Sequence, residues 1–218
     1  MDIGDSLDIR LIKTGIDLFG RDGFAATSTR AIAVAAGAQM SAITYHFGGK
    51  EGLYLACARY IAEQMRVRLG PAVGASDAVL EDDLSPAAAR ETMLGLIGGV
   101  VTVMMQDDVA LITRFVVREQ MNPTPAFNIL YEGVMSEISV RVSTLLRRIS
   151  SRPMSDEEAS VRGVALMGQV FAFRFARAVL MASTGWESTG ERETDIVRAI
   201  VLDHSNAILS ALERGGTA

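Results

Sequence analysis

Apolar side chains recur at three- and four-residue steps along most of this 218-residue chain, and this spacing limits its fold more than any other feature. In the first such segment, Ile9, Ile12 and Ile16 fall on one face of a helix. Few segments show the alternation of apolar and polar residues that is typical of a half-buried strand. The sequence therefore predicts an all-α protein.

Helix-breaking residues divide this pattern into two regions. Four short helices are expected before residue 70, and the glycine- and proline-containing residues 70–76 then make the clearest break. Ser85-Pro86 restarts a helix with an N-cap and a proline at the first helical position. We expect a three-helix domain over residues 1–50 and a helical bundle over residues 51–218, in which residues 51–69 form a linking helix. The later helices are expected over residues 86–106, 108–121, 125–150, 156–183 and 191–213.

Charge is distributed unevenly along the chain. Residues 1–70 carry eight Lys and Arg against seven Asp and Glu, whereas residues 71–218 carry 13 against 19. A nearly neutral N-terminal region on an acidic body suits a protein that contacts nucleic acid through a small surface.

Three features favour a cytoplasmic protein that does not enter a membrane. The N-terminus is acidic and lacks the charged and apolar regions of a secretory signal. The longest apolar run, Leu94–Met105, is too short to span a bilayer. Cys57 is the only cysteine, so no intrachain disulfide can form, which fits a reducing compartment.

Residues 27–47 have the pattern of two short helices joined by a tight turn. Gly37 allows the left-handed backbone conformation that such a turn needs, and Ala33 and Ala36 are small enough for the helices to cross closely. This is the pattern of a helix-turn-helix, whose second helix enters the major groove of DNA. The apolar residues expected between the helices are Ile32, Ile43 and Phe47.

The surface of this motif carries side chains suited to DNA. Thr27 and Ser28 lie at a helix N-terminus, where backbone N–H groups and the helix dipole favour a phosphate. The outward positions of the second helix have short or adaptable side chains that fit a major groove, and they are Gln39, Met40, Ser41, Ala42, Thr44 and Tyr45. At the far end of this helix lie Tyr45, His46 and Lys50, which could contact phosphates. The alternative is that Tyr45, His46 and Lys50 are only solvated surface residues. The residues predicted to contact DNA are Thr27, Ser28, Thr29, Arg30, Gln39, Met40, Ser41, Thr44, Tyr45, His46 and Lys50.

Residues 7–60 resemble the DNA-binding domain of the TetR family of transcriptional regulators. The matching motifs are Leu18-Phe19, Gly23-Phe24, Thr27-Ser28, Arg30, Ile32-Ala33, Ala36-Gly37 and Phe47-Gly48-Gly49-Lys50-Glu51-Gly52-Leu53. The resemblance implies a repressor in which the first three helices bind a palindromic operator, while the remainder dimerises and binds a small-molecule effector. The chain departs from the family at Gln39, where serine is common, and at Thr44 and His46, where aromatic residues are common.

Two C-terminal segments, residues 156–183 and 191–213, are apolar on more sides than a surface helix needs. Each is expected to pack on its own subunit and on a second one, which gives the four-helix homodimer interface that the TetR resemblance also implies. Such a dimer places two recognition helices about one DNA turn apart and requires a roughly palindromic operator. The predicted interface residues are Phe175, Val179, Ile196, Ile200, His204 and Ile208.

The segment from Arg118 to Phe127, followed by Leu130 and Glu132, resembles the CecR-like branch of the TetR family. Its residues are Arg118-Glu119-Gln120-Met121-Asn122-Pro123-Thr124-Pro125-Ala126-Phe127. This second resemblance implies control of genes for transport or tolerance of small toxic compounds, without identifying the effector.

Methionine and aromatic side chains are frequent after residue 86, and such side chains suit a roomy apolar pocket. Plain core packing is the alternative for each of them. An effector bound within residues 86–183 is expected to shift residues 51–69 and thereby change the separation of the recognition helices. The candidate ligand-binding residues are Met104, Phe115, Arg118, Met121, Phe127, Met135, Met167, Phe171 and Arg174.

Some arginines interrupt otherwise apolar helices, where a buried guanidinium needs a partner. These residues are Arg114, Arg118, Arg174 and Arg177. We favour ion pairs with nearby acids over contacts with an anionic effector. The acids considered are Glu119, Glu132 and Glu137.

No group of residues has the spacing of a catalytic, metal or cofactor site. His46 and His204 lie in different predicted domains, so a zinc site of the usual kind is not expected. Cys57 has few activating neighbours and is expected to be a small buried apolar residue. We therefore expect a protein that is not an enzyme and has no cofactor. The alternatives to a repressor are a ligand-binding scaffold with a degenerate DNA-binding head and a TetR-like activator.

Overall fold

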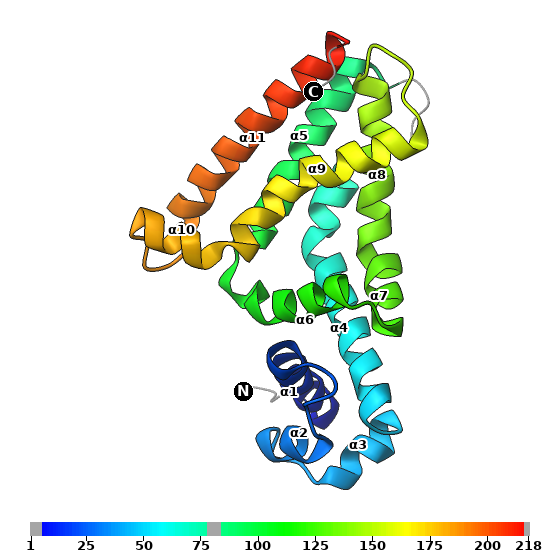
Figure 1. Cartoon of the computed structure of the whole chain (residues 1–218), viewed down its shortest axis with the longest axis vertical. Helices are drawn as coiled ribbons and strands as arrows, with labels where there is room; N and C mark the ends of the chain where they lie inside the picture. The colour runs from blue at the N-terminus through cyan, green and yellow to red at the C-terminus, as the bar shows by residue number, and fades with distance from the viewer. Residues whose placement is uncertain (1–5, 78–83, 216–218) are drawn as a thin grey trace. The chain divides into compact units, whose positions relative to one another are not determined.

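The computed structural model describes residues 6–77 and 84–215, whose secondary structure is helical with no strand in this range (Figure 1). The predicted all-α fold is confirmed. The chain divides into two compact units. The head unit comprises residues 6–66 and 110–135, and the body unit comprises residues 67–77, 84–109 and 136–215.

The head unit begins with three short helices and most of a long one. These are α1 (Leu7–Asp22), α2 (Thr29–Ala35), α3 (Met40–Phe47) and α4 (Lys50–Gly74). Ser6 caps α1, since its hydroxyl oxygen accepts a hydrogen bond from the Ile9 N–H at 3.4 Å. The face of α1 that carries Leu11, Ile16 and Phe19 is buried, as the apolar spacing predicts.

Glycines determine how the chain passes around α3. Gly37 joins α2 to α3 with a φ of +63°, the left-handed conformation that its position in the motif predicts. Gly52, in the first turn of α4, lies so near the end of α3 that a Cβ placed there would be 1.7 Å from the Phe47 carbonyl oxygen. Ile32 and Ile43 are completely buried between the helices, and the predicted helix-turn-helix is therefore formed.

A later segment of the chain completes the head unit. It contains α6 (Ala110–Met121), α7 (Pro125–Leu130) and a π turn, η3 (Tyr131–Met135). α6 packs on α1 at Gly20, where a Cβ would lie 3.2 Å from that of Arg114. The helix predicted over residues 125–150 is present over residues 125–149, but the π segment around Gly133 divides it into α7 and a later α-helix. There the backbone meets Ala62 of α4 too closely for a side chain.

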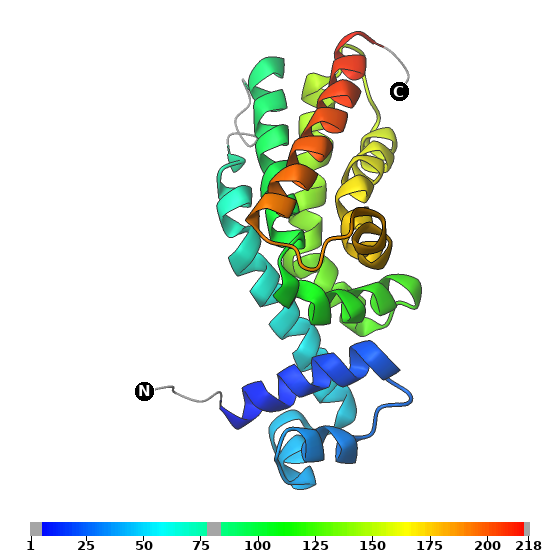
Figure 2. The same ribbon diagram turned by 90° about the vertical axis from the view of Figure 1, so that its left-hand side faces the viewer.

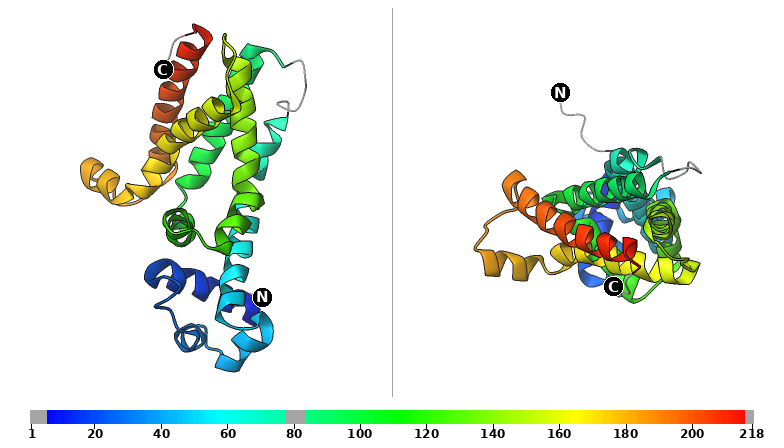
Figure 3. Two further views of the ribbon diagram at one scale, coloured as in Figure 1. Left: turned by 45° about the vertical axis from the view of Figure 1, so that its right-hand side comes forward. Right: turned by 90° about the horizontal axis from the view of Figure 1, so that it is seen from above.

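The body unit is a helical bundle built around α5. Its helices are α5 (Pro86–Met104), α8 (Ser136–Ile149), α9 (Asp156–Phe175), α10 (Arg177–Thr184) and α11 (Glu191–Glu213), with a short turn, η2 (Asp107–Val109), before α6. α5 contacts α8, α9 and α11, and the ribbons of these four helices make up most of the bundle seen in Figure 2 and Figure 3. Its length and hydropathy also suit a membrane span, but much of its surface, including Met93 and Ile97, is buried within the bundle. α5 starts at the predicted cap, where the Ser85 hydroxyl accepts from the Ala88 N–H at 3.2 Å.

The predicted end of α4 before Gly70 is wrong, because the helix continues through Pro71 to Gly74. Packing accounts for this extension. Ala72 lies against Gly99 of α5, where a Cβ would be 2.3 Å from the Ala72 methyl carbon. Close contact between two backbones stabilises a helical turn that the local sequence disfavours.

The helix predicted over residues 156–183 is also wrong as a single element. It bends by 66° at Ala176 into α9 and α10. Neither glycine nor proline marks the bend. Instead, Arg174 and Arg177 on its two sides bind the loop before α6, at the Gln106 carbonyl and the Asp107 carboxylate.

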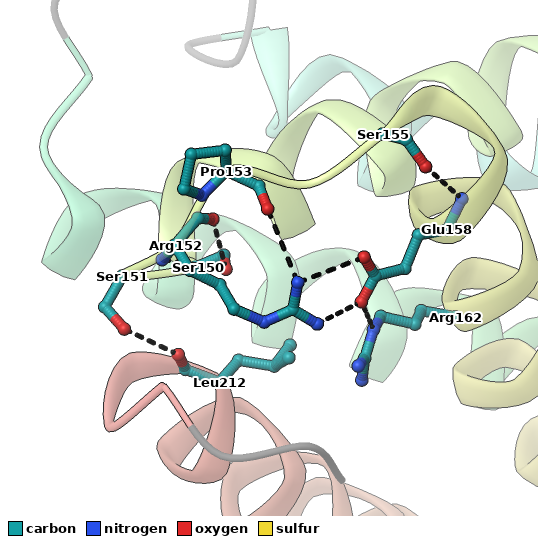
Figure 4. A network of polar contacts seen from close by, with 8 residues as sticks. All are labelled: Ser150, Ser151, Arg152, Pro153, Ser155, Glu158, Arg162 and Leu212. Atoms are coloured by element: carbon teal, nitrogen blue, oxygen red, sulfur yellow. Dashed lines mark hydrogen bonds and ion pairs between the residues drawn. The ribbon is translucent and has the colours of Figure 1, made fainter.

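A polar network holds the loop between α8 and α9 (Figure 4). Arg152 forms an ion pair with Glu158, which also accepts a hydrogen bond from Nε of Arg162 at 2.8 Å. The Ser151 hydroxyl lies 3.3 Å from the Leu212 carbonyl oxygen of α11 and donates to it. The two arginines lower the pKa of the Glu158 carboxyl below its ordinary value, so the loop is held by an ionised acid.

Candidate nucleic-acid interface

The solvent side of α3 carries polar and adaptable side chains. Tyr45 is 85% exposed, and Met40, Ser41 and Thr44 are also exposed, whereas Ile43 on the opposite side is buried. α3 therefore presents a face of the kind that enters a major groove. A shallow depression on this face is lined by Leu7, Gln39, Ser41, Ala42, Tyr45 and His46.

The N-terminus of α2 lies beside this face and has a polar cap. The Ser28 hydroxyl oxygen accepts a hydrogen bond from the Ala31 N–H at 3.1 Å. Thr29 is half-buried and Arg30 is exposed. The free N–H groups and positive dipole end of a helix start, with a cation beside them, suit a phosphate. By contrast, Gln39 makes no side-chain cap at the start of α3.

Thr27, which the sequence predicted to contact a phosphate, is buried. Its side chain is 3% exposed, and its hydroxyl lies 2.7 Å from the Gly23 carbonyl oxygen and 3.2 Å from that of Leu18. Thr27 therefore stabilises the turn between α1 and α2. Its hydroxyl does not lie on the surface, where a direct phosphate contact requires it.

Lys50, in the first turn of α4, is held by two contacts. Its Nζ lies 4.5 Å from the centre of the Phe24 ring, a cation–π distance, and donates to the Ala25 carbonyl at 3.3 Å. The side chain is half-buried, so the position of its charge is fixed relative to α2 and α3. The sequence identifies Lys50 but gives no indication of Phe24 as its support.

His46, near the end of α3, pairs with an acid that the sequence analysis missed. Its Nδ1 lies 2.9 Å from the Asp8 carboxylate in the first turn of α1, and its ring packs edge-on against Tyr45. Asp8 and His46 are far apart in sequence, and no local spacing links them. A phosphate approaching His46 would meet the Asp8 charge, so this contact is weaker than that expected at Lys50.

The candidate ligand residues fall in both units. In the head unit, Phe115 is buried, while Arg118 and Met121 are exposed, Met121 to 75%. Phe127 stacks on Tyr131, and Met135 accepts a weak hydrogen bond from Gln120. In the body unit, the buried candidates are Met104, Met167 and Arg174, with Phe171 half-buried.

Arg174 is 7% exposed and donates to the Gln106 carbonyl at 3.3 Å. Burial, together with the neighbouring Arg177, lowers its pKa below the ordinary value. Arg177 forms an ion pair, as expected for these arginines. Its partner is Asp107 at 2.7 Å, which was not among the acids considered. Of the acids considered, Glu119 binds Tyr54 and Thr124, and Glu137 pairs with Arg141. The partners of Glu119 and Arg177 lie outside their own helices, whereas Glu137 and Arg141 are one turn apart on α8, a pair that the spacing of the sequence could have indicated.

A largely apolar face extends over α9, α10 and α11. Phe175, at 59% exposed, and Val179 lie on the first two helices, and Ile196, Ile200 and His204 lie on the third. Val161 and Val164 of α9 are exposed as well. Of the predicted interface residues, Ile208 is the one that is half-buried within its own chain.

Comparison with known proteins adds independent evidence. Residues 11–57 match the family described as bacterial regulatory proteins of the tetR family, and residues 89–212 match the C-terminal domain of the HTH-type transcriptional dual regulator CecR. The chain is 32% identical over 212 residues to CecR from Shigella flexneri, which covers 97% of this chain and 95% of that protein. It is 41% identical over 68 residues to the regulatory protein RaaS from Mycobacterium tuberculosis, which covers 31% of this chain and 32% of that one.

Solved structures share the fold at low sequence identity. AibR in complex with isovaleryl coenzyme A and operator DNA has a TM-score of 0.65 and 13% identity, and the match covers 91% of this chain and 97% of that one. A TetR-like regulator from Rhodococcus sp. RHA1 has a TM-score of 0.63 and 17% identity, with 94% and 96% coverage. Together with the helix-turn-helix and its exposed α3 face, these matches establish that the chain belongs to the TetR family of DNA-binding transcriptional regulators and carries a CecR-type C-terminal domain.

Proposed function

We propose that this regulator is a cytoplasmic repressor that binds a palindromic operator as a homodimer and is released by a small-molecule effector. The observation that carries the proposal is the exposed polar face of α3, supported from behind by the buried Ile32 and Ile43. Such an arrangement leaves the side chains of one rigid helix free to contact base edges.

The proposed DNA contacts follow the surface of α2, α3 and the start of α4. Base edges are contacted from α3, and phosphates from the α2 N-terminus and from Lys50. Thr27 is assigned a supporting role, because its hydroxyl is buried. The proposed contacts are Ser28, Thr29, Arg30, Gln39, Met40, Ser41, Thr44, Tyr45, His46 and Lys50.

The proposed dimer uses the apolar face of α9, α10 and α11. Large exposed apolar side chains gathered on adjacent helices usually mark an interface. In α9, Val161, Val164, Gly168 and Phe175 follow each other at helical steps, so two copies can pack closely along one side of it. A two-fold dimer presents two α3 helices to one operator, which explains why that operator should be palindromic.

The effector is proposed to be a small molecule of largely apolar character that binds within residues 86–183. AibR, which has a similar fold, was solved with isovaleryl coenzyme A, a small molecule with an apolar acyl group on a charged carrier. Candidate contacts are those predicted from the sequence, with Met104, Met167 and Arg174 buried in the body unit. Binding shifts the equilibrium toward a state with weaker operator affinity only if the effector prefers that state. Residues 51–69 of α4 are the proposed connection to the head.

Titration of DNA from upstream of the protein's own gene tests this function. Fluorescence anisotropy should give a lower Kd for a palindromic segment of that DNA than for random DNA of the same length, with a strong salt dependence. Tyr45→Ala and Lys50→Ala should weaken specific binding. Equal affinity for the two DNAs, with no effect of either substitution, would favour the scaffold reading and exclude the repressor.

One observation favours a second mode of action, in which the protein activates some genes as well as repressing others. The CecR relative from Shigella flexneri is named a dual regulator, which describes a protein that acts in both directions on transcription. Transcript profiling of a deletion strain separates the modes, because repressed genes rise and activated genes fall. We propose that genes for transport or tolerance of small toxic compounds are among those that rise.

A further inference from the structure

Near the end of α6, the adjacent residues Arg118 and Glu119 bind the rest of the head unit in different ways. Arg118 reaches the C-terminal end of α1, where its Nε donates to the Gly20 carbonyl at 2.7 Å and its Nη2 to the Arg21 carbonyl at 2.5 Å. Carbonyls at a helix C-terminus lack intrahelical partners and carry the negative end of the dipole, so a guanidinium satisfies both needs. Gly23 leaves the space for it, since a Cβ there would lie 3.0 Å from Nη1.

Glu119 points into the interior of the head unit and is 2% exposed. Its carboxylate accepts hydrogen bonds from the Tyr54 hydroxyl at 2.5 Å, and from the N–H and hydroxyl of Thr124, each at 3.0 Å. A buried carboxylate is costly unless donors surround it, so these three bonds fix where it lies. Burial and the bond to Glu119 raise the pKa of the Tyr54 phenol, which therefore remains a donor.

Tyr54 connects this carboxylate to the DNA-facing side of the head. Its ring contacts that of Phe24 at a centre-to-centre distance of 5.0 Å, and the Phe24 ring carries the Lys50 ammonium at 4.5 Å. Aromatic contacts of this kind depend on ring orientation, which the hydroxyl bond to Glu119 fixes for Tyr54. The contacts therefore run from Glu119 through Tyr54 and Phe24 to Lys50. The other rings around Tyr54 are those of Phe115 and Phe19, at 4.7 and 4.9 Å.

We infer that Glu119 and Arg118 are positioning residues for DNA binding: Glu119 holds Lys50 in place through Tyr54 and Phe24, and Arg118 holds the end of α1. This inference rests on the proposed function, because it takes Lys50 as a phosphate contact. It gives the CecR-like segment that begins at Arg118 the function of supporting the residues that contact DNA. The same segment contains Arg118, Met121 and Phe127, which the sequence predicted to contact the effector. The inference gives Arg118 a different role, that of holding α1.

The first test needs no DNA. The chain has only two lysines, Lys13 and Lys50, so their rates of modification by an amine-reactive reagent can be compared within one sample by mass spectrometry. In the wild-type protein Lys50 should react slowly, because Phe24 and the Ala25 carbonyl hold its ammonium. Glu119→Ala, which removes the acceptor of the Tyr54 hydroxyl, and Tyr54→Phe should each raise the Lys50 rate severalfold relative to Lys13. Unchanged relative rates in both variants would overturn the inference.

A matched control comes from the same segment. Glu132 is exposed and belongs to the same CecR-like segment, so Glu132→Ala removes the same side chain without breaking the Tyr54 bond. Its lysine rates should equal those of the wild type. Tyr54→Phe serves as the second variant if Glu119→Ala does not fold, since it removes the same bond and leaves the carboxylate in place.

The second test uses operator affinity as a function of salt. Loss of one phosphate contact lowers the slope of log K against log salt by about 0.9. Lys50→Ala and Glu119→Ala should both lower the slope, and the double variant should show no further decrease, because both act on the same contact. Additive decreases would show that Glu119 does not act through Lys50, and a wild-type slope in Glu119→Ala would do the same.

Arg118 is tested by Arg118→Lys, which keeps the charge but loses the paired geometry of the guanidinium. Operator affinity should fall, and amide hydrogen exchange at the end of α1 should increase. Arg114→Lys, one turn earlier on α6, should change neither. If the wild-type protein does not bind its operator but the lysine rates respond as expected, the proposed function fails while the positioning of Lys50 by Glu119 stands.

Discussion

Replacing Gly52 by alanine should destabilise the head unit, although alanine is the better helix former. Within a helix, a glycine-to-alanine change normally stabilises by about 0.5–1 kcal/mol. At Gly52, however, the new Cβ would lie 1.7 Å from the Phe47 carbonyl oxygen, half the 3.4 Å at which ordinary contact begins. Because that oxygen belongs to the backbone, no side chain can move aside, and α3 must separate from α4.

The size of the effect follows from what that separation breaks. The two helix ends that must move are held by the last hydrogen bond of α3, from the Gly48 N–H to the Thr44 carbonyl at 2.9 Å, and by the first of α4, from the Leu53 N–H to the Gly49 carbonyl at 3.1 Å. Each is worth about 1 kcal/mol net. With the lost packing of the buried Leu53 added, we expect a destabilisation of about 3 kcal/mol.

Amide hydrogen exchange over residues 40–53 measures this change in the head unit itself, and urea unfolding followed by circular dichroism measures it in the whole chain. Gly95→Ala is the matched control, because Gly95 lies within α5 and a Cβ there meets nothing within 4 Å. The control should be slightly more stable than the wild type. A Gly52→Ala protein with wild-type exchange and operator affinity would refute the steric argument.

Three further predictions concern the surface and the loop network. Tyr45→Ala should weaken operator binding by roughly 1–3 kcal/mol in anisotropy titrations without changing the unfolding midpoint, since its side chain is 85% exposed. Phe175→Asp should convert the proposed dimer to a monomer in size-exclusion chromatography with light scattering, whereas Val67→Asp, an equally drastic change at an exposed valine of α4, should leave it dimeric. Glu158 stabilises the fold above its ordinary pKa, since Arg152 and Arg162 lower its pKa in the folded state, and this contribution is lost as the pH falls through the lowered value. Glu158→Gln should therefore make the unfolding midpoint depend less on pH below about pH 5, and an unchanged dependence would contradict the assignment.

Local sequence information was sufficient wherever the structure is set by neighbouring residues. The spacing of Ile12 and Ile16 predicts the buried side of α1, Ser85-Pro86 predicts the start of α5, and Gly37 predicts the turn between α2 and α3. Each depends on contacts within a few residues or on the conformation of a single one. The predictions fail where packing from elsewhere dominates, as at Pro71, which Gly99 of α5 helps to retain within a helix through Ala72.

The same distinction between local spacing and contacts from elsewhere in the chain applies to the candidate site. Which residues of α3 face the solvent follows from helical spacing, and Tyr45 and Thr44 are exposed as predicted. The supports of the site do not follow from spacing, because Asp8 binds His46 and Glu119 binds Tyr54 across long stretches of sequence. Thr27 shows the same limit, since a hydroxyl at a helix start suits a phosphate and an interior carbonyl equally well until the fold selects one.

The grouping of α6 and α7 with the head unit bears on how the proposed effector acts. The chain passes between the two units at three places: within α4 after Arg66, before Ala110 and after Met135. The second lies directly after the short turn η2 and the third at the end of the π turn η3, so both are irregular helix, which yields more readily than regular α-helix. Since Arg118 and Glu119 bind α6 to α1 and α4, a displacement of α6 moves the DNA-facing helices with it. We therefore propose that an effector acts by changing the path of the chain through η2 and η3, which would alter how α3 is presented.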